Sequence, residues 1–214
     1  LEGYRNFCNK LWNAARFVLM NVAGQPLAPA QGSTLADRWI LSRFSRCVET
    51  VHAQLAAYRF DLAARALYEF TWNEYCDWYL ELVKPVLAPG GAAPQVQAAT
   101  RRTLVAVLEA LLRALHPLMP FITEELWQQV APVAGACGES VMLQAYPDAD
   151  FYPLDPDAEA GLDWVRAFVL GIRQIRGEMD IPPARRVPLL LQGATAADRQ
   201  LAGEHGRLLC ELAK

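Results

Sequence analysis

Apolar residues recur at helical spacing in the first segment of the chain, from about residue 5 to residue 22. They form one stripe along a helix of 3.6 residues per turn, at the positions Phe7, Leu11, Ala14, Val18 and Val22. Gly24 and Pro26 follow directly, and both residue types are typical of a helix end. The pattern therefore predicts one amphipathic helix that ends near Gly24.

The same reasoning predicts four more helices before residue 132. One begins at Thr34, which can cap the helix together with Asp37 three residues later. The others run from Asp61 to about Pro85, from Ala98 to Leu115, and over a short segment with carboxylates in its first turn, Thr123-Glu124-Glu125. Each helix has a broad apolar face, and the connections are short. The predicted fold class is mainly α, an antiparallel helix bundle.

A second unit is predicted beyond residue 150. Gly, Pro and Asp are concentrated between Pro132 and Pro156, and we expect the boundary there, with domains at 1–150 and 151–214. A helix should begin at Asp155-Pro156, with Pro in the first helical position. The apolar run Val187–Leu191 is typical of a buried strand. A single strand cannot form a sheet, so we expect a small, truncated α/β subdomain, with Val141–Leu143 as a possible further strand.

Composition and cysteine spacing argue against a membrane-spanning protein and against a cysteine metal site. The chain has 53% hydrophobic residues and a net charge of −3, with no apolar run of the roughly 20 residues that a membrane helix needs. Residues 1–60 carry seven basic and three acidic side chains, so a local patch could meet phosphate. The five cysteines are scattered without metal-ligand spacing, as expected for reduced thiols in the cytoplasm.

Signatures of a self-contained enzyme are missing from the sequence. It contains no glycine-rich phosphate loop, no G-x-S-x-G turn and no H-E-x-x-H pair. The three histidines are far apart, and the paired carboxylates are better explained as helix starts. We therefore expect no catalytic residues, no metal site and no cofactor in this chain.

Two predicted helices carry an unusual density of asparagine and aromatic residues. The first has Asn9, Lys10, Trp12 and Asn13 close together, and the third has a cluster around Trp72. One interpretation is that Trp12 and Trp72 belong to the core, as large aromatic residues usually do. The other is a pocket for splayed RNA bases, which stack on rings and are hydrogen-bonded along their edges.

Four ordered segments resemble the anticodon-binding domain of bacterial valyl-tRNA synthetases. They are GYRNFCNKLWNAARFVL at 3–19, ADRWILSR at 36–43, YEFTWNEYCDWYLE at 68–81 and HPLMPFITEELW at 116–127, and MDIPP at 179–183 also fits. The resemblance implies a class I aminoacyl-tRNA synthetase that joins valine to its tRNA with ATP and Mg²⁺. It implies a monomeric cytoplasmic parent whose catalytic, editing and coiled-coil parts lie outside this fragment.

The resemblance also implies a set of anticodon-binding residues. By similarity to the methionyl branch, an Asn and an Arg on the first helix and a Trp on a later helix contact the anticodon. The residues at or beside the matching positions are Asn9, Lys10, Asn13, Arg16, Phe17, Trp72, Tyr75 and Trp78. The expected partners are the anticodon loop of the valine tRNA and the remainder of the synthetase chain, with no DNA and no membrane.

Two other interpretations remain open. The first is the anticodon-binding domain of a sister synthetase, foremost the isoleucyl enzyme, whose first helix is more Arg-rich. The second is a helical scaffold or protein-interaction module in which the aromatic residues are core. It predicts no salt-dependent affinity for tRNA.

Overall fold

The computed structural model describes residues 2–148, 150, 152–182 and 185–213. These divide into two compact units, 1–156 and 157–214, and each is described by itself. The predicted boundary near residue 150 falls among positions outside the described residues, as does Pro183, the last residue of the MDIPP motif. Among the described residues, no helix is long and apolar enough to cross a membrane.

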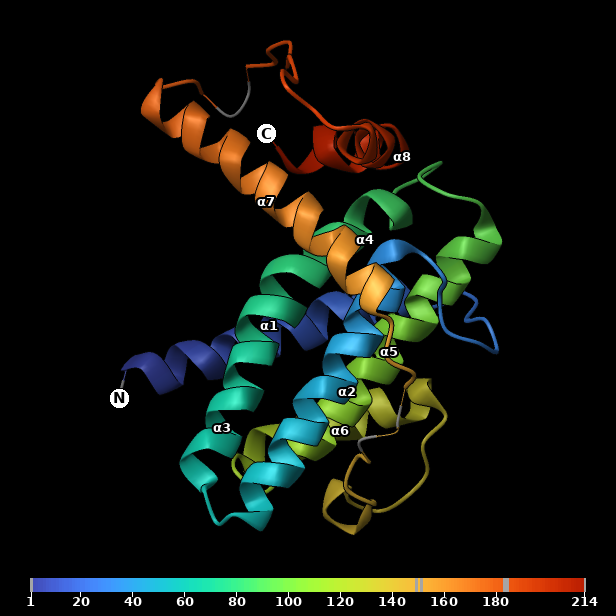
Figure 1. Ribbon diagram of the computed structural model, residues 1–214. Coiled ribbons are helices and arrows are strands. Elements are labelled where there is room, and N and C mark those ends of the chain that lie inside the picture. The colour runs from blue at the N-terminus through green and yellow to red at the C-terminus, as the bar shows by residue number, and fades with distance from the viewer. Residues whose placement is uncertain (1, 149, 151, 183–184, 214) are drawn as a thin grey trace. The chain divides into compact units, whose positions relative to one another are not determined.

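The first unit is a bundle of long helices joined by short connections (Figure 1). Its helices are α1 Glu2–Val22, α2 Leu35–Ala56, α3 Phe60–Glu69, α4 Leu80–Leu87, α5 Pro94–Leu115 and α6 Pro120–Ala134. A π-helix, η1 Phe70–Tyr79, joins α3 to α4, and a 3₁₀ turn, η2 Val141–Leu143, follows α6. The mainly helical bundle predicted from the sequence is confirmed.

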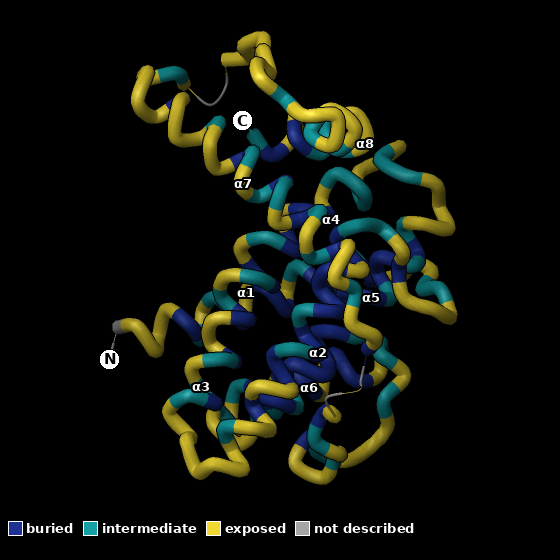
Figure 2. The backbone as a smooth tube through the Cα atoms, viewed as in Figure 1, coloured by how far each residue is buried: buried dark blue, intermediate teal, exposed yellow. Residues whose placement is uncertain are grey.

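The predicted apolar stripe of α1 is the buried face of that helix. All five of its positions are buried, with Leu11 and Val18 completely enclosed. Figure 2 shows buried backbone gathered in the middle of the bundle, whereas the first turns of α1 project from it, and residues 3–6 are all exposed. The helix ends as predicted, because Gly24 adopts a left-handed φ of 66° that glycine tolerates at no steric cost.

A buried carboxylate connects three parts of the bundle. Asp37, in the first turn of α2, has no exposed surface and accepts hydrogen bonds from Thr34 Oγ1 at 2.7 Å, Tyr79 OH at 2.7 Å and Thr100 Oγ1 at 2.8 Å. Thr34 also caps α2 by accepting from the Asp37 amide at 3.1 Å, as the sequence predicts. The loop before α2, the π-helix and α5 therefore meet at one side chain.

The second unit contains two helices, α7 Pro156–Glu178 and α8 Ala196–Leu212. Trp164 Nε1 donates to Asp198 Oδ1 at 2.9 Å, and Arg173 donates to the Leu212 carbonyl oxygen, so the side chains of α7 hold α8. Together with residues 185–191 the helices line an open pocket of about 540 Å³. As predicted, α7 begins with a proline at its first position.

The predicted α/β character of the second unit is wrong. The described residues contain no strand, and Val187–Leu191 is a strand-free segment in which Leu190 is 87% exposed. A strand needs a neighbour to satisfy its backbone groups, and none is available. The other candidate, Val141–Leu143, is a 3₁₀ turn in the first unit, where the Glu124 carboxylate accepts from Ser140 and from the Val141 amide.

The burial of Asp37 predicts a particular dependence of stability on pH. Desolvation raises its pKa above the ordinary value, although the hydroxyl donors oppose that shift. A raised folded-state pKa gives stability that is complete below about pH 4 and is lost as the pH rises through the folded pKa. Relative to Asp37→Asn, the parent should therefore lose free energy of unfolding as the pH increases from 4 towards neutrality. Urea unfolding of both proteins across this range measures the difference, and a parent that gains stability relative to the variant would contradict the raised pKa.

Candidate nucleic-acid interface

The exposed face of α1 carries three of the eight residues predicted to contact RNA, Asn9, Asn13 and Arg16, together with Trp12. Residues three and four positions apart lie on one side of a helix, and the structure exposes Asn9, Trp12, Asn13 and Arg16 together. The core stripe lies on the opposite side of the same helix. The amphipathic pattern that fixes the buried face therefore also fixes which side chains face solvent.

Lys10 and Phe17 lie beside this face. Lys10 contacts the π-helix, and Phe17 lies near Lys84 of α4. The Lys10 ammonium group pairs with the Asp77 carboxylate at 2.5 Å and lies 3.8 Å from the centroid of the Trp72 ring. The Lys10 side chain is only 22% exposed. It therefore connects α1 to the π-helix by an ion pair and a cation–π contact at once.

The Trp72 ring also belongs to a stack of aromatic side chains. Phe7 and Tyr68 are 5.0 Å apart between ring centroids, and Tyr68 and Trp72 are 5.7 Å apart, with interplanar angles of 26° and 19°. Trp72 is half-buried in consequence. The stack and Lys10 together occupy much of the ring surface, so Trp72 serves the packing of α1 more than it offers a platform for a base.

The π-helix determines which side chains of the segment 70–79 face inward. Four of its five buried residues are spaced five positions apart, Phe70 with Tyr75 and Thr71 with Cys76, and the fifth is Tyr79. Backbone hydrogen bonds over five residues define this helix type, and the Leu80 amide donates to the Tyr75 carbonyl oxygen. The sequence analysis missed this element, although the five-residue spacing of Phe70 and Tyr75 is its signal.

Tyr75 lies in the core rather than on the candidate surface. Its side chain has no exposed area, and its hydroxyl donates to the Leu104 carbonyl oxygen at 3.1 Å. Burial raises the pKa of its phenol well above the ordinary value. The predicted contact of Tyr75 with a base is corrected by this position, because no base can reach the ring while the bundle is folded. Trp78 is half-buried on the following turn.

Two ionisable side chains that the sequence analysis did not select lie next to Phe17. The Lys84 ammonium group is 5.9 Å from the centroid of the half-buried Phe17 ring and pairs with the Glu81 carboxylate at 2.5 Å. Both come from α4, directly after the π-helix. They extend the polar rim of the interface towards the C-terminal end of α1.

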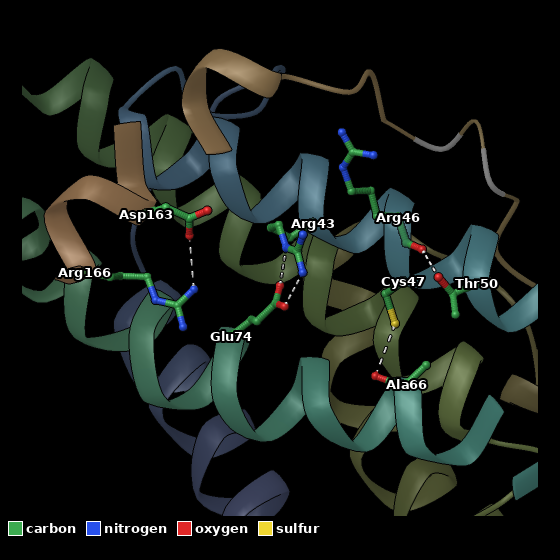
Figure 3. A network of polar contacts seen from close by, with 8 residues as sticks. All are labelled: Arg43, Arg46, Cys47, Thr50, Ala66, Glu74, Asp163 and Arg166. Carbon is green, nitrogen blue, oxygen red and sulfur yellow. Dashed lines mark hydrogen bonds and ion pairs between the residues drawn. The ribbon is translucent and has the colours of Figure 1, made fainter. Parts of the chain in front are cut away.

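An ion pair anchors the π-helix to α2 on another side. Arg43 donates two hydrogen bonds to the Glu74 carboxylate, at 2.9 and 2.7 Å, and both side chains are partly buried (Figure 3). Nearby, the Cys47 thiol donates to the Ala66 carbonyl oxygen, and burial raises the pKa of this thiol to about 12. Cys47 is therefore a packing residue in its thiol form, as expected for a buried free cysteine.

The arrangement offers hydrogen-bonding and stacking groups without a bond-breaking constellation. Asparagine amides both donate and accept, which matches the edge of an adenine, and exposed rings and guanidinium groups suit unstacked bases and phosphates. Trp12 is 42% exposed on this face, although the sequence analysis considered it for the core. The sequence signal for this exposure is the position of Trp12, three residues after Asn9 and four before Arg16, which places it on the polar face of the helix.

A comparison with known protein families finds one match over more than half of the chain. The family model described as "Anticodon-binding domain of tRNA ligase" matches residues 37–191. The match includes Trp72, Tyr75 and Trp78, whereas α1 precedes it. Of the predicted residues on α1, Lys10 contacts the matched π-helix, through Asp77 and Trp72.

The separation of core from surface predicts a large loss of stability for one substitution and almost none for another. Tyr75→Ala empties a fully buried site and should reduce the free energy of unfolding by roughly 3–5 kcal/mol. Asn13→Ala removes an exposed amide and should change it by no more than about 0.5 kcal/mol. Urea denaturation followed by circular dichroism measures both values. A small loss for Tyr75→Ala would place that ring outside the core.

Proposed function

The chain belongs to the family of anticodon-binding domains of class I tRNA ligases, and we propose that it reads the anticodon loop of a valine tRNA. The family supports tRNA as the partner. The observation that carries the choice of surface is the exposure of Asn9 and Asn13 on one face of α1, beside a π-helix that lies within the matched region.

The proposed reading mechanism uses the amide groups of α1. Anticodon bases lie in a loop, so they can leave the stack and present their edges to a protein. Valine codons begin with G-U, which places an adenine at the centre of every valine anticodon and a cytosine at its last position. An asparagine can hydrogen-bond an adenine edge by donating and accepting at once. We assign this role to Asn13, with Asn9 one turn away and Trp78 as the stacking ring.

The low net charge of the chain supports weak, salt-dependent binding of tRNA. The net charge is −3, and Lys10 and Lys84 are paired with carboxylates. Few phosphate contacts remain, and each one that forms releases counterions. Affinity for tRNA should therefore be modest and should fall as the salt concentration rises.

The choice of valine over isoleucine depends on the last anticodon base. Isoleucine codons begin with A-U, so isoleucine anticodons share the central adenine and end in uracil instead of cytosine. Asn13 alone therefore cannot distinguish the two tRNAs. The asparagine-rich segment 9–13 supports valine, because it resembles the valyl enzymes. A preference for a terminal uracil would favour the isoleucyl alternative.

The remaining functions of the parent protein are also proposals. We propose that valine activation with ATP and Mg²⁺ occurs elsewhere in a monomeric cytoplasmic synthetase, and that this chain supplies tRNA recognition. The first unit would carry the anticodon contacts, and the second would be an appended subdomain.

Removal of one amide should weaken base recognition. Asn13→Ala should reduce affinity for a valine anticodon stem-loop by roughly 1–3 kcal/mol and should shrink the preference for adenine at the centre. Fluorescence anisotropy with stem-loops that carry each of the four central bases measures both effects. Gln200→Ala, an exposed amide on α8, is the matched control and should bind like the parent. If Asn13→Ala keeps full affinity and the full preference for adenine, the amide does not read this base.

The 214-residue chain should bind tRNA without activating an amino acid. Its sequence carries neither a phosphate-binding loop nor a catalytic constellation, so purified protein should show no valine-dependent pyrophosphate exchange with ATP. Active full-length valyl-tRNA synthetase serves as the positive control. Exchange that follows the purified chain through successive columns would overturn the assignment of catalysis to another part of the parent.

A further inference from the structure

The exposed face of α1 has two flanks that point in different directions. Lys10 and Phe17 turn towards the π-helix and α4, where they meet Trp72 and Lys84. Arg5, Trp12 and Arg16 follow one another at spacings of seven and four residues. At 3.6 residues per turn, both arginines lie within about 40° of Trp12 around the helix axis, and Trp12 lies about 160° from Lys10. We call Arg5, Trp12 and Arg16 the outer flank.

The aromatic residue of the outer flank is free to take a partner. Trp12 is 42% exposed, and it makes no ring contact with any of the residues that the structure describes. Trp72, in contrast, is stacked on Tyr68 and lies beneath Lys10. Of these two rings on α1 and the π-helix, Trp12 is the one that offers an unoccupied face.

The two arginines of the outer flank differ in charge pairing from several other cations of the first unit. Lys10, Arg43 and Lys84 are paired with carboxylates. Arg5 and Arg16 are exposed and form neither an ion pair nor a hydrogen bond with any described residue. They are eleven residues apart, which corresponds to about 16 Å along the helix. An exposed ring between two such cations has the composition of a single-strand nucleic-acid site.

We infer that the outer flank is a second RNA contact, where a nucleotide outside the three anticodon bases stacks on Trp12 while Arg5 and Arg16 bind the neighbouring phosphates. This inference rests on the proposed function, because it requires that the chain bind an RNA loop. The flank is polar around Trp12, with Asn9 and Asn13 next to it, and its free charge is complementary to phosphate.

The contact at the outer flank does not depend on which base is bound, whereas anticodon reading does. Every base has a face that can stack on an indole ring, and a guanidinium group recognises phosphate without regard to sequence. The outer flank therefore adds affinity and holds the loop in register. The amide group of Asn13, about 100° around the helix axis from Trp12, reads the base edge.

Trp12→Ala and Arg5→Gln test the inference in the 214-residue chain. Trp12→Ala should weaken binding of the valine stem-loop about tenfold or more, by an equal factor for all four central bases. Arg5→Gln should reduce the slope of log affinity against log salt concentration by about one. Tyr58→Ala, an exposed aromatic residue in the turn after α2, and Arg65→Gln on α3 are the matched controls. Circular dichroism verifies that each variant is folded.

A set of abasic stem-loops locates the stacked nucleotide. Removal of one base outside the anticodon should weaken binding to the parent but not to Trp12→Ala, because the lost base and the lost ring form one contact. Unchanged affinity and salt slope in Trp12→Ala and Arg5→Gln would overturn the inference, even if Asn13→Ala still loses affinity. An effect of Trp12→Ala limited to one central base would also overturn it, by placing Trp12 in the anticodon pocket. A parent that binds no stem-loop would refute the proposed function itself.

Discussion

The buried carboxylate of Asp37 is the interaction on which the first unit depends. Thr34, Tyr79 and Thr100 donate to it from the start of α2, the end of the π-helix and the start of α5. Gly32 lies so close to it that a side chain there would collide with the carboxylate. An acidic group without water must find donors from the protein, and these donors come from segments that are far apart in the sequence. Its burial therefore joins chain segments that the hydrophobic core alone would hold less specifically.

The position of Tyr79 at this carboxylate also determines the exposed surface. Tyr79 is the last residue of the π-helix, so its hydrogen bond to Asp37 fixes the rotation of the preceding turns. With that rotation, Tyr75 points to the backbone of α5 while Trp72 and Asp77 meet Lys10 of α1. The ion pair of Lys10 with Asp77 and its cation–π contact with Trp72, together called the Lys10 clamp, in turn help to fix the rotation of α1 about its own axis. The hydrogen bonds at Asp37 thus support the same orientation of α1 that its buried apolar stripe sets.

The sequence predicts the helices well because their signals are local. The stripe of α1, the Thr34 cap and the proline at the start of α7 each depend on residues within a few positions of one another. The candidate site is harder to predict, because α-helical periodicity does not show the five-residue spacing that buries Tyr75. The sequence left Trp12 open between the core and an exposed pocket, and the structure places it on the exposed side, beside Asn9 and Arg16. The strand predicted at Val187–Leu191 failed for a non-local reason, since pairing depends on a neighbour that the run itself cannot reveal.

The two flanks of α1 separate two physical tasks that one surface would combine poorly. Edge recognition requires fixed amide groups, and the Lys10 clamp supplies that rigidity next to Asn13 by tying α1 to the π-helix. Stacking and phosphate contact tolerate side-chain motion, and the outer flank has two long arginine side chains without fixed partners. A loop that contacts both flanks would wrap around a single helix, so its total affinity would be shared between a sequence-dependent and a sequence-independent part. Such sharing would allow a chain of net charge −3 to bind RNA through a few well-placed groups, because Arg5 and Arg16 present exposed positive charge on the same helix as Trp12.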